Sequence, residues 1–174
     1  MSPVLPAVPL RGAAAVPERL AAIDRQRRHA ALATVDGGRP YLSLVAFALD
    51  VDGDGVLFST PRDSRKYRNL RRQPRVSLLL DTRGERDRDY GAAEAVTVTG
   101  RAEVLRAGSA RRLAAAQALL AKHPALASFI GAPTTAVVRV AIEEAVHVAG
   151  FQRVTVWKPH LRGEETAASA RDLR

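Results

Sequence analysis

The sequence contains no cysteine among its 174 residues. This absence excludes disulfide bonds, thiolate zinc sites, iron–sulfur ligation and cysteine nucleophiles. The chain also lacks an apolar run of about 18 residues, the length that spans a bilayer as a helix, and its N-terminus lacks the basic and then apolar layout of a secretory signal. We therefore expect a cytoplasmic protein with no membrane partner, stabilised by packing and by a partner subunit.

Aromatic residues are scarce, at 5% of the chain, so few side chains can stack on nucleic-acid bases. Lysine and arginine number 27 against 18 acidic residues, which gives a net charge of +9, and 24 of the 27 are arginine. The acidic residues lie between the basic ones, as on a solvated surface. We therefore predict no nucleic-acid partner, and we infer that the positive field favours an anionic cofactor or substrate.

Length and composition fit a single globular domain. Residues 1–17 contain four prolines without a regular period and predict a flexible N-terminal arm. The folded domain is expected over residues 18–157, followed by a loose C-terminal tail over 158–174. Residues 82–93 are rich in charge and glycine and predict a surface loop.

Short segments with alternating or continuous apolar residues predict a mainly β fold. Seven strands are expected, over residues 30–35, 41–49, 56–59, 76–80, 96–104, 138–142 and 151–157. Helices are expected over residues 16–28, over 62–73 before Pro74, and after a Ser109 cap as far as Pro124. Many short strands with glycine-rich and aspartate-rich turns favour a closed or nearly closed antiparallel barrel.

Residues 41–49 and the turn that follows them indicate where this strand lies and whether the turn binds a metal. Residues 41–49 are apolar on both faces, which indicates a strand buried within a barrel or between a sheet and a partner. Residues 50–55 imitate the start of a calcium loop, but Pro61 occupies the position of the closing glutamate. We interpret residues 50–55 as a hairpin turn and predict no metal site.

The segment after the third strand has the composition of an anion site. Thr60 can cap a helix with Pro61 at its first position, where free backbone amides and the helix dipole attract negative charge. Ser64 adds a hydroxyl group, Arg65 a forked donor and Lys66 a point charge within one turn. These groups suit a terminal phosphate, although an ordinary capped surface helix has the same spacing.

Three stretches in this order resemble a known superfamily. They are Ala-Leu-Ala-Thr-Val-Asp-Gly-Gly-Arg-Pro-Tyr from residue 31, Ser-Thr-Pro-Arg-Asp-Ser-Arg-Lys from 59 and Gln-Pro-Arg-Val-Ser-Leu-Leu-Leu from 73. Followed by Thr-Gly-Arg-Ala-Glu at 99–103, they resemble the pyridoxamine 5′-phosphate oxidase-like FMN-binding split β-barrel superfamily. Residues 122–124 and 146–151 are more weakly similar to its haem-utilisation branch.

The resemblance implies an antiparallel split β-barrel that forms a homodimer. It also implies FMN, or in some branches a deazaflavin or haem, bound in a groove between the subunits. The phosphate-contacting positions of the superfamily match Thr60, Ser64, Arg65 and Lys66. The backbone of residues 42–45 matches the strand that packs against the cofactor ring. The predicted cofactor-binding residues are Ser59, Thr60, Ser64, Arg65, Lys66, Leu42, Ser43, Leu44 and Val45.

Departures from the vitamin-forming oxidases imply a different activity. Their basic pair aligns with Ser43 and Ala48, their cofactor-contacting glutamine aligns with Ala95, and their C-terminal Arg-x-His-Asp-Arg pattern is replaced at 150–153. We expect an FMN-binding oxidoreductase acting on an unknown small molecule. A deazaflavin-dependent reductase and a non-catalytic binder of flavin or haem are the alternatives, with His147 as the candidate haem ligand. No residue is assigned as catalytic.

Overall fold

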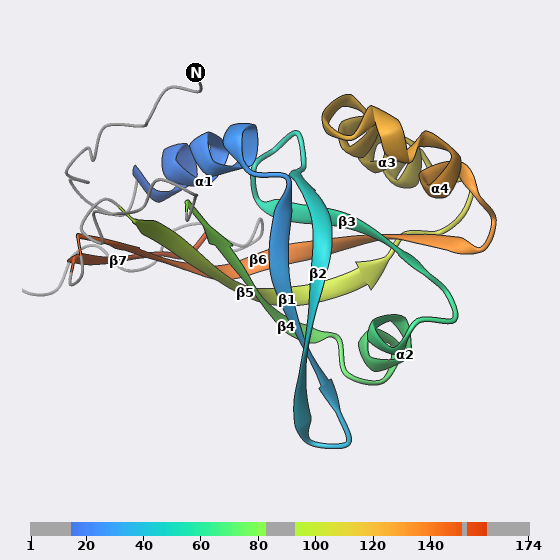
Figure 1. Cartoon of the computed structure of the whole chain (residues 1–174), viewed down its shortest axis with the longest axis horizontal. Helices are drawn as coiled ribbons and strands as arrows, with labels where there is room; N and C mark the ends of the chain where they lie inside the picture. The colour runs from blue at the N-terminus through green and yellow to red at the C-terminus, as the bar shows by residue number, and fades with distance from the viewer. Residues whose placement is uncertain (1–14, 83–92, 151–152, 160–174) are drawn as a thin grey trace, which may run out of the picture.

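The computed structural model describes residues 15–82, 93–150 and 153–159. Seven antiparallel strands form one sheet in the order β3-β2-β1-β4-β5-β6-β7, and a further pairing of β3 with β6 closes β1 to β6 into a barrel (Figure 1). The strands are β1 (His29–Asp36), β2 (Arg39–Leu49), β3 (Gly55–Pro61), β4 (Arg75–Asp81), β5 (Glu94–Val104), β6 (Thr135–Ala149) and β7 (Arg153–Trp157). The predicted mainly β, antiparallel barrel is confirmed.

Helical segments lie outside the barrel (Figure 1). They are α1 (Ala15–Gln26), α2 (Arg65–Arg72), α3 (Ala110–Lys122), the 3-10 turn η2 (Pro124–Leu126) and α4 (Ala127–Gly131). The Ser109 cap of α3 is confirmed, because its hydroxyl oxygen accepts a hydrogen bond from the Arg112 amide. Within the described ranges, no helix is long and apolar enough to cross a membrane. Most of the predicted arm, charged loop and tail, residues 1–14, 83–92 and 160–174, lie outside the described residues.

Strand β6 is much longer than the predicted 138–142. Its first half pairs with β3 and its second half pairs with β7, while β5 pairs with it over most of its length. Residues at its start are buried on both faces, so the period-2 alternation that marks a half-buried strand is missing there. Burial on both faces therefore hides the start of the strand from a prediction that rests on alternation.

Two hydrophobic clusters stabilise the fold. The larger fills the barrel with side chains such as Phe47, Phe58, Leu78 and Val140, and α1 adds Val16, Leu20 and Ile23 to it. The smaller cluster lies outside the barrel, where α3 and α4 pack on the outer face of β2, β3 and β6. Its buried members are Ala48, Leu57, Leu105, Ala115, Leu119, Ile130 and Val137. We call the α3, η2 and α4 segment, residues 110–131, the helical lobe.

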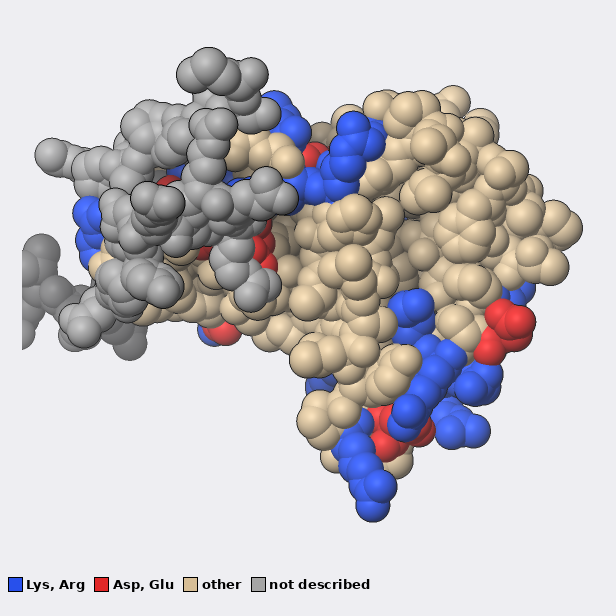
Figure 2. Space-filling model, viewed as in Figure 1, with Lys and Arg blue, Asp and Glu red and all other residues tan. Residues whose placement is uncertain are grey.

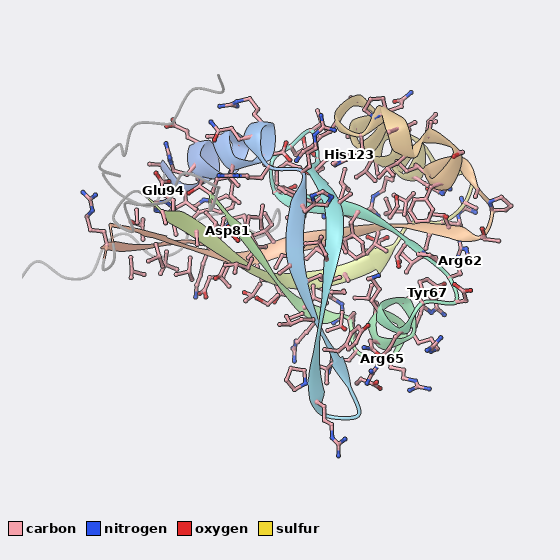
Figure 3. The ribbon with its side chains drawn as sticks, in the orientation of Figure 1. Arg62, Arg65, Tyr67, Asp81, Glu94 and His123 are labelled. Atoms are coloured by element: carbon pink, nitrogen blue, oxygen red, sulfur yellow. The ribbon has the colours of Figure 1, made fainter. Side chains whose placement is uncertain are left out.

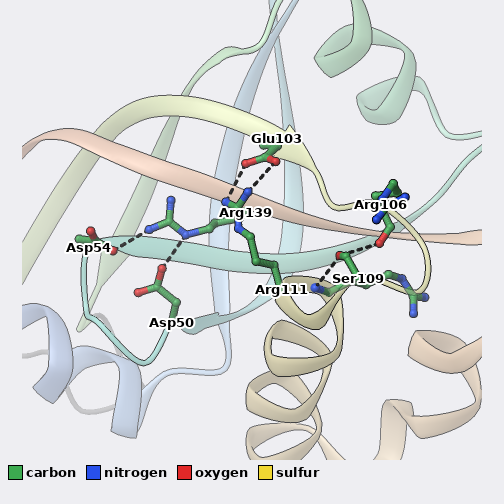
Figure 4. Close-up of polar contacts among 8 residues, drawn as sticks. Asp50, Asp54, Glu103, Arg106, Ser109, Arg111 and Arg139 are labelled. Carbon is green, nitrogen blue, oxygen red and sulfur yellow. Dashed lines mark hydrogen bonds and ion pairs between the residues drawn. The ribbon is translucent and has the colours of Figure 1, made fainter. Parts of the chain in front are cut away.

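The aspartate-rich segment is the β2–β3 hairpin turn, as predicted. Gly53 adopts a φ of +73°, which favours glycine. Arg139 of β6 lies between two of the carboxylates, with Nε 2.7 Å from Asp50 Oδ2 and one terminal nitrogen 2.6 Å from Asp54 Oδ1 (Figure 4). A single guanidinium group therefore pairs with two of the carboxylates of this turn.

Candidate functional site at the helical lobe

The predicted start of α2 is wrong. The helix begins at Arg65, and Ser64 is its cap: the Ser64 hydroxyl oxygen accepts a hydrogen bond from the Tyr67 amide at 3.2 Å. Thr60 cannot cap the helix, because it and Pro61 continue β3 and pair with β6. Pairing with β6 thus keeps this segment extended for two residues beyond the predicted strand end at residue 59.

Thr60 and Ser64 nevertheless lie together. Their hydroxyl oxygens are 2.8 Å apart, and Ser64 Oγ lies 2.8 Å from the Pro61 carbonyl oxygen, which it can reach as a donor. Thr60 is buried at 1% exposure. Both hydroxyl groups are therefore engaged in shaping the turn between β3 and α2.

Arg65 contacts the β1–β2 hairpin. Its Nε donates to Asp36 Oδ2 at 2.7 Å, and its guanidinium group lies 4.4 Å from the centre of the Tyr41 ring. These contacts hold α2 against the end of the hairpin (Figure 3). In this structure the Arg65 charge is paired with a carboxylate.

A cleft of about 200 Å³ lies between the helical lobe and the outer face of β2 and β3. On the barrel side it is lined by Leu44 to Ala46, Ser59 and Pro61, and Lys66 from α2 also lines it. The Ser59 hydroxyl is buried and has no hydrogen-bond partner. A buried polar group without a hydrogen-bond partner is rare and indicates a position where a ligand or water can bind. The cleft therefore offers an unsatisfied hydroxyl group and an ammonium group.

The lobe side of the cleft is almost entirely apolar. It is lined by Leu119, His123, Leu126, Phe129 and Ile130. His123 is 4% exposed, and its Nε2 lies 2.8 Å from the Phe47 carbonyl oxygen of β2. Figure 3 shows the His123 ring beside β2, on the side of the barrel where the lobe lies.

The structure brings together four of the nine predicted cofactor-binding residues at this cleft: Leu44, Val45, Ser59 and Lys66. The paired hydroxyl groups of Thr60 and Ser64 lie in the adjoining turn. Leu42 is 68% exposed on the outer face of the sheet, and the buried Ser43 hydroxyl has no partner. Because Ser43 alternates with outward-facing Leu42 and Leu44, its side chain points into the barrel.

Sequence reasoning missed the lobe as a wall of the cleft. The Lys-His-Pro stretch at 122–124 is similar to the haem branch, but nothing in it indicates proximity to β2. His123 contacts Phe47 across 76 positions of sequence. Only the packing of the lobe on the barrel creates this wall.

His147, the candidate haem ligand, lies in a buried ion cluster. Its Nε2 is 3.1 Å from Glu94 Oε2, and the Glu94 carboxylate also binds the Arg19 guanidinium group of α1. His147 is 2% exposed and does not line the cleft. This position disagrees with a role as a haem ligand, because Nε2 already has a carboxylate partner. Among the described residues, no group of three or more metal-ligating side chains could hold an ion.

Surface charge is unevenly distributed around this site. Figure 2 shows an uncharged surface over β1 and β2 that continues toward α3 and α4, while lysine and arginine gather around α2 and the end of the β1–β2 hairpin. On β2, Leu42 and Leu44 are each 68% exposed. The cleft thus has an apolar sheet face on one side and the basic helix α2 beside it.

Several solved structures share this fold. A haem-binding protein from Mycobacterium smegmatis has a TM-score of 0.73 and 24% identity, over 86% of this chain and 60% of that chain. An FAD-binding protein from Mesorhizobium loti has a TM-score of 0.59 and 24% identity, over 79% and 92%. The haem storage protein HutZ from Vibrio cholerae has a TM-score of 0.59 and 20% identity, over 80% and 92%. At these identities the similarities establish the fold alone.

This chain spans about three fifths of the length of the Mycobacterium protein. No curated protein sequence matches it. The model of one sequence family, described as pyridoxamine 5′-phosphate oxidase, matches residues 16–149, from the first turn of α1 to the end of β6. Family model and barrel topology agree over most of the chain, and the protein belongs to the pyridoxamine 5′-phosphate oxidase family.

Proposed function

We propose that this protein is an FMN-binding oxidoreductase that acts on a small molecule other than pyridoxamine phosphate. The observation that supports this most strongly is the cleft, where Lys66 and the partnerless Ser59 hydroxyl lie beside apolar walls. FMN has the matching chemistry, because a ribityl chain joins a phosphate dianion to a flat ring whose faces can pack on apolar side chains. The choice of FMN agrees with a family that includes flavin enzymes and with a structural relative that binds a flavin.

The residues present fit the two ends of this cofactor. Lys66 would supply a positive charge to the phosphate, and Ser59 Oγ would donate a hydrogen bond that it now lacks. Leu44 offers an exposed apolar surface against which a ring can pack. FMN, when bound, supplies the electron and hydride transfer, while the chain's own residues bind it, orient it and shield it from water.

The size of the cleft supports a site completed by a second subunit. Its volume of about 200 Å³ lies below the roughly 300–1,000 Å³ of most ligand pockets. The outer face of β2 next to it is exposed and apolar, and strand register extends this face across the sheet without a charged side chain. That row is Leu44, Ala31, Leu79, Thr97, Val146 and Val156. We propose that a second copy covers this row and closes the cleft over FMN.

The first test is a spectroscopic titration of the purified protein with FMN, then with a deazaflavin and with haem. Retention of a flavin spectrum after desalting is the result expected. Exclusive uptake of the deazaflavin would replace FMN with that cofactor, and a Soret band with no flavin uptake would overturn the proposal in favour of haem binding. A further addition of reduced nicotinamide should bleach bound FMN if the protein is an oxidoreductase.

Variants of α2 test which residues hold the phosphate. Loss of a charge-assisted hydrogen bond costs about 1.5–3 kcal/mol, so Lys66→Ala should weaken FMN binding roughly 10- to 100-fold. Arg65→Ala should add a smaller loss, because Arg65 is already paired with Asp36. Arg68→Ala, an exposed site on the same helix, is the matched control. Equal affinities in the Lys66→Ala/Arg65→Ala protein and the parent would refute the site.

The subunit contact is tested separately by sedimentation. The parent should have twice the mass of one chain, and Leu44→Glu should shift it toward a single chain, because a carboxylate would be buried against apolar side chains. Val51→Glu, at a turn position that is 94% exposed, should leave the mass unchanged. A monomeric parent would overturn the dimer.

A further inference from the structure

His123 is a buried polar group on an otherwise apolar wall. It lies at the C-terminal cap of α3, where its backbone amide donates to the Leu119 carbonyl oxygen at 2.8 Å. Pro124 follows and starts the η2 turn, so the chain changes direction at this residue. The cap and the packing against β2 fix the position of the imidazole ring in the cleft.

The contact with β2 determines which ring nitrogen carries the proton. A backbone carbonyl oxygen can only accept a hydrogen bond, so His123 Nε2 must be the N–H donor to Phe47. Burial lowers the pKa of His123, and the positive charges of Lys122 and Arg28 lower it further, against the opposing effect of the Phe47 contact. The imidazole is therefore neutral near pH 7, and Nδ1 carries a lone pair.

Within the described part of the chain, Nδ1 has no hydrogen-bond partner. The neighbouring lining residues of the lobe are Leu119, Leu126, Phe129 and Ile130, none of which has a side-chain donor. An unpaired acceptor in apolar surroundings lowers affinity when a ligand displaces its water without replacing the hydrogen bond. A ligand with a donor at this point avoids that cost, so the wall discriminates between otherwise similar molecules.

We propose that His123 determines substrate specificity: its Nδ1 accepts a hydrogen bond from the N–H or O–H group of a small, mostly apolar substrate bound against the helical lobe. This inference rests on the proposed function, in which FMN occupies the Lys66 end of the same cleft. His123 holds the donor-bearing end of the substrate, and the leucine, phenylalanine and isoleucine side chains contact its apolar body.

Phenol and anisole are the probes for this assignment. Their aromatic rings are the same, but phenol has an O–H donor and anisole has a methyl ether. Binding of each probe to the full chain, with and without saturating FMN, is measured by ¹⁵N NMR of labelled histidine, which also reports the tautomer of His123. We expect the Nε2–H tautomer, tighter binding of phenol than of anisole, and a shift of Nδ1 on addition of phenol alone.

Two variants separate the acceptor from the shape of the wall. His123→Leu removes the acceptor and should weaken phenol binding about tenfold, equivalent to about 1.4 kcal/mol, while anisole binding changes less than about twofold. His123→Gln can donate to Phe47 and still present an amide oxygen, so it should restore the preference for phenol. Equal losses for both probes in His123→Leu would indicate a purely structural role and overturn the proposal.

The outcomes distinguish this inference from the proposed function. A parent that binds FMN but shows no preference for phenol, or binds neither probe, overturns the role of His123 alone. A parent that prefers phenol but takes up no FMN overturns the cofactor alone and leaves the acceptor established. Displacement of phenol by FMN would assign Nδ1 to the cofactor and overturn the substrate role.

Discussion

The buried Arg19–Glu94–His147 cluster makes Glu94→Gln the most informative perturbation of stability. Arg19 and Glu94 side chains are 8% and 5% exposed, and one terminal nitrogen of Arg19 lies 2.6 Å from both carboxylate oxygens. Glu94 begins β5 (Figure 3). His147 lies on the adjacent β6, and Arg19 comes from α1. A neutral amide at position 94 would leave the Arg19 charge buried without a counter-charge.

The expected loss follows from this geometry. Removing one partner of a buried ion pair costs about 3–5 kcal/mol, out of a total stability of about 5–15 kcal/mol for a typical domain. At roughly 2–4 °C per kcal/mol for a chain of this size, the melting temperature should fall by about 6–20 °C. Replacing both partners, as in Arg19→Met with Glu94→Gln, should recover part of this loss, because no unpaired cation remains.

Urea unfolding at pH 7, followed by fluorescence of Trp157, the single tryptophan of the chain, measures the change. Glu103→Gln is the matched control, because Glu103 pairs with Arg111 where the two side chains are 53% and 60% exposed (Figure 4). That control should lose less than about 1 kcal/mol. If Glu94→Gln and Glu103→Gln lose equal amounts, burial of the ion cluster does not determine its contribution.

The pH dependence of the parent provides a second check. Burial raises the pKa of Glu94, but hydrogen bonds from His147 and Arg19 and their charges outweigh it, so the net pKa lies below the ordinary value. A carboxyl group with a lowered folded-state pKa stabilises the fold above its unfolded pKa of about 4.3 and loses this contribution as pH falls. The difference between parent and Glu94→Gln should therefore shrink below about pH 4.

Two further predictions concern the barrel itself. A Cβ at Gly100 would lie 2.1 Å from the Ala141 backbone oxygen, so Gly100→Ala should lower the free energy of unfolding by more than about 2 kcal/mol. Gly131 has open space around it, so Gly131→Ala should change the free energy of unfolding by less than about 1 kcal/mol. Similar effects at both glycines would contradict the close approach at Gly100. Arg139→Met should cost about 1–3 kcal/mol at pH 7 because it leaves Asp50 without its charged partner. Burial raises the pKa of Asp50 despite the opposing effect of Arg139, so the loss should decrease as pH falls and Asp50 takes up a proton. Unfolding curves at several pH values test this, and a loss that grows toward low pH would refute it.

Elements that depend on a local pattern could be predicted from the sequence. The alternation of residues 96–104 predicts β5 correctly, because every second side chain faces the barrel interior. Ser109 predicts the start of α3, because capping requires only the hydroxyl and an amide three residues later. The hairpin turn at residues 50–55 likewise follows from its own aspartates and glycines. Each of these signals lies within a few residues of the feature that it predicts.

Contacts between distant segments set the start of α2 and the surroundings of the predicted site residues. Pairing of β3 with β6 keeps Pro61 extended and moves the cap of α2 from Thr60 to Ser64. Arg65 is paired with Asp36 on a hairpin that lies 29 positions earlier in the chain. The cleft exists because the helical lobe, a late segment, packs on β2, an early one, and so places His123 beside Phe47. Contacts between distant segments depend on the whole fold, and no local pattern encodes them.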